Sequence, residues 1–566
     1  MTAAVDQWRR QALAALRRSG DATETTPLDQ VADLLATRTY DGLRIDALRT
    51  PHDPATPPTG LPGRWPFVRG TRVAGGWDVR QRHGGEEPKD VRESIRDDLD
   101  NGVTSVWLDA DADALPELLD GVDLGRAGVT LDAGADFAAA GAAFLRHRPG
   151  DRVGGLGADP LGWRARTGAE ADVRAAAALA VRCVAEAPTL RAITVDATVY
   201  HEAGGSDAQE LGCAAATGVA YLRALTDAGL TVEDALHQLE FRYAADADQF
   251  ATIAKFRAAR RIWSRIAELC AAPDAGGQVQ HAVTSAAMMT VRDPWVNLLR
   301  TTVAAFAAAV GGAGAVTVLP FDDRLGQPDP AARRLARCTQ LVLLEEAHIG
   351  RVTDPGGGSH YVEHYTQELA EAGWDWFTTI ERAGGLAAAL DCGLIPDRLA
   401  ATRARRAENI AHRRDPITGV SEFPDLDDVP PERLPAPAPP GGGLPRYFYA
   451  EAFERLRDRA DAHPSRPVVF LATLGAPAVS GARATFAANL FAAGGIAVVT
   501  GPVEEFAASR TAVACVCGPD EAVPAAVAAL REAGAKRVWV AGGDLRQGCD
   551  AVEVLTRSLD DLGVRP

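Results

Sequence analysis

Apolar, β-branched runs bounded by turn residues alternate with longer segments of helical periodicity over the first three quarters of the chain. Such strand-like runs cover residues 77–83, 105–110, 128–133, 153–159, 192–199, 239–244, 279–286 and 315–322. A helix-like segment follows each run; the clearest lie at 90–100, 172–187, 207–228, 246–271, 294–310 and 328–348, whereas the Ala/Gly-rich third segment, 133–146, has the weakest pattern. Eight strand-then-helix units predict a closed (β/α)8 TIM barrel. An open sheet is the alternative, and the number of units favours the barrel.

The pattern changes after two further predicted helices, 362–383 and 395–412. Residues 423–445 are rich in proline and glycine, which is typical of a linker, and a charged helix is predicted at 447–462. Strands are then expected at 467–473, 496–501, 512–518 and 537–542, and helices at 482–493, 519–533 and 547–562. This alternation predicts a small doubly wound, flavodoxin-like α/β domain, whose first strand-to-helix loop would be the ligand-binding position.

These patterns divide the chain into four parts. Residues 1–60 hold one amphipathic helix and an irregular arm, which we expect to lie on the barrel or on a partner. Residues 61–422 form the barrel with its helical extension, 423–465 the linker and helix, and 466–566 the small α/β domain.

Charge and composition exclude several classes of function. The chain carries 59 basic and 76 acidic residues, a net charge of −17, which argues against binding to nucleic acid. No signal-type or membrane-spanning apolar stretch is present, so no membrane association is expected. Eight sparse cysteines indicate a reducing cytoplasm, and Cys515 and Cys517 lie in an apolar run typical of a buried strand. No metal site is predicted: His360 and His364, four residues apart, lack an accompanying acidic motif.

Short motifs spread over residues 40–420 resemble the acyl-CoA mutases that use cobalamin. They are YDGLRIDALRTP at 40–51, WPFVRG at 65–70, WDVRQ at 77–81, YHEAG at 200–204, AKFRAARRIW at 254–263, NLLRT at 297–301, CTQL at 338–341 and DPGGGSHYVE at 354–363. A barrel followed by a linker and a small doubly wound domain is also that family's layout. Methylmalonyl-CoA mutase is the member that the resemblance indicates, and it implies adenosylcobalamin as the cofactor and an acyl-CoA as the substrate.

The departures from the family pattern concern residues that carry the chemistry. The family's catalytic tyrosine would fall at 71–76, where this chain reads TRVAGG. Its DxHxxG loop, whose histidine ligates cobalt, is replaced by LGAPAVSGAR at 474–483, with Pro477 and Val479 near the places of the aspartate and histidine. No histidine follows His463. We therefore expect no cofactor-binding residue on this chain.

His201 is the remaining catalytic candidate, because a histidine in this segment of the family hydrogen-bonds the thioester carbonyl. The alternative is a structural histidine retained from common ancestry. Arg164 or Arg166 could replace the family's carboxylate-binding arginine; a solvated loop arginine is the simpler interpretation.

Two functions remain open. In the first, this chain is a non-catalytic subunit that stabilises a larger catalytic chain in a heterodimer, with adenosylcobalamin and the acyl-CoA bound by that partner. In the second, it is an independently active acyl-CoA mutase or isomerase that uses His201. The first predicts a barrel filled by bulky side chains, and the second predicts a channel lined by small residues.

Overall fold

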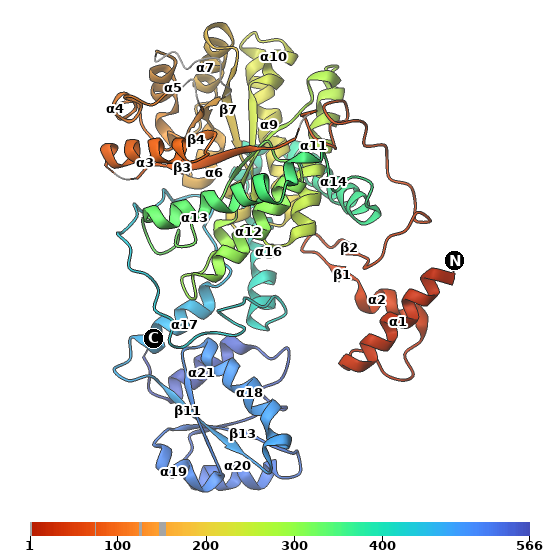
Figure 1. Cartoon of the computed structure of the whole chain (residues 1–566), viewed down its shortest axis with the longest axis vertical. Coiled ribbons are helices and arrows are strands. Elements are labelled where there is room, and N and C mark those ends of the chain that lie inside the picture. The colour runs from red at the N-terminus through yellow and green to blue at the C-terminus, as the bar shows by residue number, and fades with distance from the viewer. Residues whose placement is uncertain (1–2, 74, 86, 124–126, 147–153, 566) are drawn as a thin grey trace.

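The computed structural model describes residues 3–73, 75–85, 87–123, 127–146 and 154–565. Figure 1 shows three parts: a large α/β body, a smaller α/β unit at the C-terminus, and N-terminal helices that stand to the side of the body. The predicted strand beginning at residue 153 starts just outside the described residues and continues within them.

All eight predicted barrel strands are present, and they close into a parallel barrel in the order β10-β3-β4-β5-β6-β7-β8-β9. Their bounds are β3 Asp78–His83, β4 Ser105–Leu108, β5 Gly128–Leu131, β6 Gly154–Ala158, β7 Leu190–Asp196, β8 Leu239–Ala245, β9 Val279–Thr284 and β10 Ala315–Thr317. The prediction of a closed barrel is therefore confirmed, and the open sheet is excluded.

Helices surround the barrel, and they include the six with the clearest predicted periodicity together with short ones that were not predicted. They are α3 Pro88–Asp100, α4 Leu115–Leu118, α5 Phe137–Arg146, α6 Pro160–Thr167, α7 Val173–Glu186, α8 Thr198–Glu202, α9 Asp207–Asp227, α10 Val232–His237, α11 Gln249–Leu269, α12 Val296–Val310 and α13 Pro330–Leu341. The segment with the weakest pattern does contain a helix, α5. The predicted helix at 328–348 is shorter than expected, because a π-helical turn, Val342–Glu346, follows α13.

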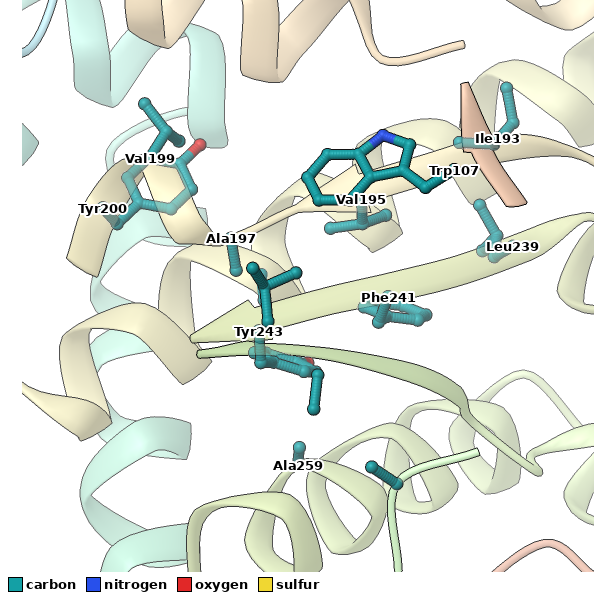
Figure 2. Close-up of a cluster of buried hydrophobic side chains, with 14 of the residues drawn as sticks. Trp107, Ile193, Val195, Ala197, Val199, Tyr200, Leu239, Phe241, Tyr243 and Ala259 are labelled. Atoms are coloured by element: carbon teal, nitrogen blue, oxygen red, sulfur yellow. The ribbon is translucent and has the colours of Figure 1, made fainter. Parts of the chain in front are cut away.

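Apolar residues at alternate positions of the barrel strands face the helices. Phe241 packs edge-on against Trp263 of α11, with 4.6 Å between the ring centroids. Figure 2 shows Phe241 and Tyr243 on the side of β8 that faces Ala259 of α11, with Trp107 on the opposite side of the strand. Arg242, which lies between Phe241 and Tyr243 in β8, therefore points into the barrel.

Three more helices pack beside the barrel: α14 His360–Arg382, α15 Leu386–Asp391 and α16 Leu394–Ala411. The N-terminal part holds α1 Ala3–Ser19, α2 Val31–Leu35 and the short antiparallel pair β1 Thr37–Arg38 and β2 Arg44–Ile45, which is more structure than the single helix predicted. Leu13, Ala22 and Val31 form a small apolar cluster within this part.

The C-terminal unit is a four-stranded parallel sheet in the order β12-β11-β13-β14. Its strands are β11 Val468–Thr473, β12 Ala497–Gly501, β13 Val513–Cys517 and β14 Arg537–Val540, and its helices are α18 Pro477–Ala493, α19 Phe506–Ser509, α20 Val523–Glu532 and α21 Ala551–Asp561. Alternate residues of β11 enter two separate apolar clusters, Val469 and Leu471 in one and Phe470 and Ala472 in the other, so both faces of the sheet are covered. The helix α17 Glu451–Asp461 leads into this unit.

A boundary prediction in the C-terminal unit is also wrong. The helix after β11 begins at Pro477 and not at 482, so Pro477 and Val479 lie in its first turn and not in a loop. Proline at the first helical position lacks the N–H that would be unsatisfied there, so it favours this earlier start.

None of the described helices is long and apolar enough to cross a bilayer.

Candidate functional site

A cavity of about 300 Å³ lies at the carboxyl ends of the barrel strands, where barrel enzymes keep their active sites. Its walls include Trp107, Asp132, Trp163, Arg166, His201 and Ser285. This volume is at the lower limit for pockets that hold drug-sized ligands.

Bulky charged and aromatic side chains fill the barrel below this cavity. Arg80 Nη1 donates to Glu240 Oε1 at 2.6 Å, and both side chains are almost fully buried. The Arg242 guanidinium lies 4.1 Å from the centroid of the Trp107 ring, and the His281 ring meets the same tryptophan edge-on at 5.4 Å. A filled interior is the arrangement that the structural-subunit hypothesis predicts.

The predicted linker is packed against the barrel and runs across the mouth of its cavity; residues 423–449 are called the strap below. The backbone N–H groups of Gly443, Leu444 and Tyr447 donate to main-chain carbonyls of α6 and α8 at 3.1, 2.8 and 2.7 Å. Pro439 and Pro440 form part of the cavity wall. Proline and glycine thus fit close backbone contacts here, although composition alone suggested a loose connection.

His201 lies in α8, directly after β7, and its side chain is buried. Its Nε2 is 2.7 Å from Ser285 Oγ and 3.4 Å from the hydroxyl of Tyr449, which belongs to the strap. Burial, with the positive charges of Lys255 and Arg406, lowers the pKa of His201 well below its usual value, so the imidazole is neutral. The nitrogen that could donate to a thioester carbonyl already has partners within the chain.

The two candidate arginines lie on α6 and not in a loop. Arg164 is paired with Asp391. Arg166, on the cavity wall, lies 3.1 Å from Glu202 and 3.7 Å from Asp196. Both guanidinium groups therefore have carboxylate partners within the chain.

The loop of the C-terminal sheet that the resemblance assigns to the cobalt ligand has no suitable donor. Val479 is 55% exposed on the first turn of α18, and neither it nor Pro477 carries a nitrogen or sulfur ligand. The Arg483 side chain lies over the carboxyl edge of the sheet, where it donates to Gly518 O and lies 2.8 Å from Asp520. A Cβ at Gly542 would meet the Arg483 guanidinium at 3.0 Å. These residues do not fit a cobalamin held from below by a histidine.

The predicted strands did not indicate that charged side chains face the interior of the barrel. Arg80, Glu240 and Arg242 stand at alternate positions of predicted strands, so charged residues within an apolar run were the available signal. Ser285 and Tyr449 had no such signal, because Ser285 reaches His201 from the end of β9 and Tyr449 reaches it from the strap, and only the fold brings them together.

A closed barrel with a cavity at its carboxyl end, followed by a strap and a parallel α/β sheet, is the layout that the resemblance to the acyl-CoA mutases implies. The family model described as methylmalonyl-CoA mutase matches residues 163–438. The chain belongs to the methylmalonyl-CoA mutase family, because relatives with that name align with it over 99% of its length at 53% and 37% identity.

Relatives named as small subunits align over the whole chain. A methylmalonyl-CoA mutase small subunit of Streptomyces virginiae is 53% identical, covering 99% of this chain and 97% of that protein. The small subunit of Propionibacterium freudenreichii subsp. shermanii is 37% identical over 99% of this chain and 95% of its own length. By contrast, the protein of Escherichia coli named methylmalonyl-CoA mutase is 32% identical over 43% of this chain and 34% of its own length.

Proposed function

We propose that this chain is the small, non-catalytic subunit of an adenosylcobalamin-dependent methylmalonyl-CoA mutase. It stabilises a large subunit that binds the cofactor and the acyl-CoA, and the heterodimer interconverts (R)-methylmalonyl-CoA and succinyl-CoA. The filled barrel carries this proposal: the Arg80–Glu240 pair and the Trp107–Arg242 stack occupy the space that a threaded acyl-CoA would need.

The C-terminal unit, residues 466–566, supports the same assignment. Its strand order, with β11 between β12 and β13, is that of flavodoxin-like domains. We take it as a cobalamin-binding-type domain that has lost its histidine ligand, so that adenosylcobalamin belongs to the large subunit.

Contact with a partner also explains why apolar residues are exposed on the outer face of α12. This helix has one charged residue, Arg300, among its fifteen; Leu299 within it is 67% exposed, and Trp295 directly before it is 52% exposed. A helix that is apolar on all sides is normally buried. We assign this face, together with the N-terminal arm of residues 1–60, to contact with the large subunit, as obligate interfaces are large and partly apolar.

Co-purification with the large subunit, with cobalamin absorbance recorded for each chain and for the pair, tests the proposal. The expected result is a one-to-one complex in which the large subunit and the pair carry the cobalamin spectrum and this chain alone does not. Stoichiometric uptake of cobalamin by this chain alone would overturn it.

The alternative, an independently active mutase or isomerase that uses His201, is supported only by the cavity beside that residue. It is tested by His201→Asn in the assembled enzyme. Loss of a general acid or hydrogen-bond donor from an active site lowers turnover by about 10²-fold or more. We expect turnover to change by less than about twofold, because the large subunit supplies the chemistry.

A further inference from the structure

A second cavity, of about 570 Å³, lies beside the barrel and separate from the one at its mouth. The β1–β2 pair, the carboxyl end of β8 and helices α14 and α16 enclose it, and His201 contributes to the walls of both cavities. The second cavity therefore lies where the N-terminal arm joins the body.

The walls of this cavity are strongly acidic. Its carboxylates are those of Asp41, Asp207, Asp246, Asp248 and Asp415. Against these five stand Arg406 and the exposed Arg38, while Lys255 behind the wall is shared by Asp207 at 2.9 Å and Glu210 at 2.8 Å. His201 adds no charge, because its pKa is far below neutrality. Negative charge is thus in excess in a partly enclosed space.

The hydrogen bonds that Asp41 and Asp248 accept do not neutralise this excess of negative charge. Asp41 accepts from Ser206 Oγ at 2.5 Å and from a backbone N–H, and Asp248 caps α11 by accepting from the backbone N–H of Ala251 at 3.1 Å. These donors are neutral. Burial raises the pKa of both Asp41 and Asp248 to about 6, and the negative charge of Asp207 contributes to both shifts.

An aromatic hydroxyl provides an independent indication of a ligand. Tyr365 lines the cavity and is only 6% exposed, yet its hydroxyl has no hydrogen-bond partner among the described residues. Burial raises the pKa of this hydroxyl, and the carboxylates of Asp207, Asp248 and Asp41 raise it further, so the hydroxyl stands among the acidic groups. The hydroxyl is not one of the enclosed side-chain atoms that lack a partner, so a donor bound in the cavity that Tyr365 lines could reach it.

The arrangement suits an organic cation better than a metal ion. In the described parts of the chain, no three His, Cys, Asp or Glu side chains are grouped as metal ligands would be. Phe250 and Tyr361, whose rings meet at 5.2 Å, add aromatic surface to the wall. Carboxylates and a hydroxyl accept N–H donors, and aromatic rings attract cations, so one ligand chemistry fits both parts.

We propose that this cavity binds a primary ammonium or guanidinium group. A free aliphatic amine can supply the group, or a Lys or Arg side chain of the large subunit can insert beside the N-terminal arm; only the second source rests on the proposed function.

Binding of agmatine, which carries both groups, to the full chain tests the proposal by calorimetry. Asp248→Asn keeps the helix cap but removes one charge, and Tyr365→Phe removes only the hydroxyl. Asp172→Asn is the matched control, because Asp172 caps α7 in the same way, away from the cavity. We expect each cavity variant to weaken agmatine binding at least tenfold or to abolish it, and the control to bind like the wild type.

The second source is tested in the assembled enzyme. If a side chain of the large subunit occupies the cavity, agmatine competes with assembly, and Asp248→Asn and Tyr365→Phe weaken association at least tenfold while Asp172→Asn does not. The proposal is overturned if the cavity variants change neither agmatine binding nor association. Cobalamin uptake by the small chain would refute the proposed function but would leave the agmatine result intact.

Discussion

Arg80 on β3 and Glu240 on β8 form a buried ion pair inside the barrel, although β3 and β8 are not neighbours in it. The distance from Arg80 Nη1 to Glu240 Oε1 is 2.6 Å, and the two side chains are 6% and 4% exposed. Arg80 also donates to Ser105 Oγ at 3.1 Å. Each charge therefore depends on a partner supplied by a distant part of the sequence.

Removing one member of this pair leaves an uncompensated charge inside the barrel. We expect Glu240→Ala to lower the free energy of unfolding by about 3–5 kcal/mol, whereas the double replacement Arg80→Met with Glu240→Leu is close to neutral or stabilising. Urea denaturation of the wild type, the single variant and the double variant measures the three free energies of unfolding. A loss below about 1 kcal/mol for Glu240→Ala would mean that water reaches the pair.

His281 makes the stability of the chain depend on pH. Arg242 Nε donates to His281 Nδ1 at 3.3 Å, so Nε2 carries the proton and donates to Thr317 Oγ1 at 2.8 Å. Burial and the charges of Arg80 and Arg242 lower the pKa of His281 well below its usual value. Below about pH 6.5 the unfolded chain therefore binds a proton that the folded chain does not, and stability falls as the pH falls.

His281→Gln isolates this effect, because buried carboxylates with raised pKa values, such as Glu210, act in the opposite direction. We expect the stability advantage of the wild type over the variant to shrink by up to about 1.4 kcal/mol per pH unit between pH 6.5 and 5. Urea unfolding across this range gives the difference. An advantage that stays constant with pH would show that folding does not lower the pKa of His281.

The regular elements of this chain could be predicted because their signals are local. Each barrel strand is a short apolar run and each outer helix has a 3.6-residue period, so all eight strands were located without knowledge of their neighbours. The start of α18 was misplaced because Pro477 is typical both of a turn and of a first helical position.

The site depended on contacts that the sequence pattern does not contain. Tyr449 approaches His201, 248 positions away, only because the strap crosses the barrel mouth, and proline-rich composition predicted a loose linker there. The second cavity gathers Asp41, Asp248 and Tyr365 from three distant segments. No spacing of residues in the sequence predicts that these three side chains line one cavity.

The strap, residues 423–449, is held within its first half by Arg433. Its Nε donates to Asp322, a fully buried carboxylate whose pKa is raised by burial, and its Nη2 lies 3.0 Å from Asp329. We expect Arg433→Ala to release residues 430–445, because Asp322 loses its partner and the strap loses its anchor. Hydrogen exchange of these residues should rise at least tenfold.

Arg455→Ala is the matched control for the strap, since Arg455 forms an exposed pair with Glu451 one helical turn away. Such surface pairs contribute little to stability, so exchange in the strap should not change. Equal exchange in the wild type and Arg433→Ala would show that the backbone bonds of Gly443 and Leu444 hold the strap without Arg433.

The outer face of α12 gives the most direct test of association. Leu299 is 67% exposed, so Leu299→Asp should leave the unfolding of the isolated chain almost unchanged. In the heterodimer the new carboxylate would be buried against apolar surface without a partner, and we expect the dissociation constant to rise at least tenfold, about 1.4 kcal/mol. Leu269→Asp, at a residue 61% exposed at the end of α11, is the control. If both substitutions leave the dissociation constant unchanged, the large subunit binds another face; if both raise it equally, the effect is one of general charge and not of contact with α12.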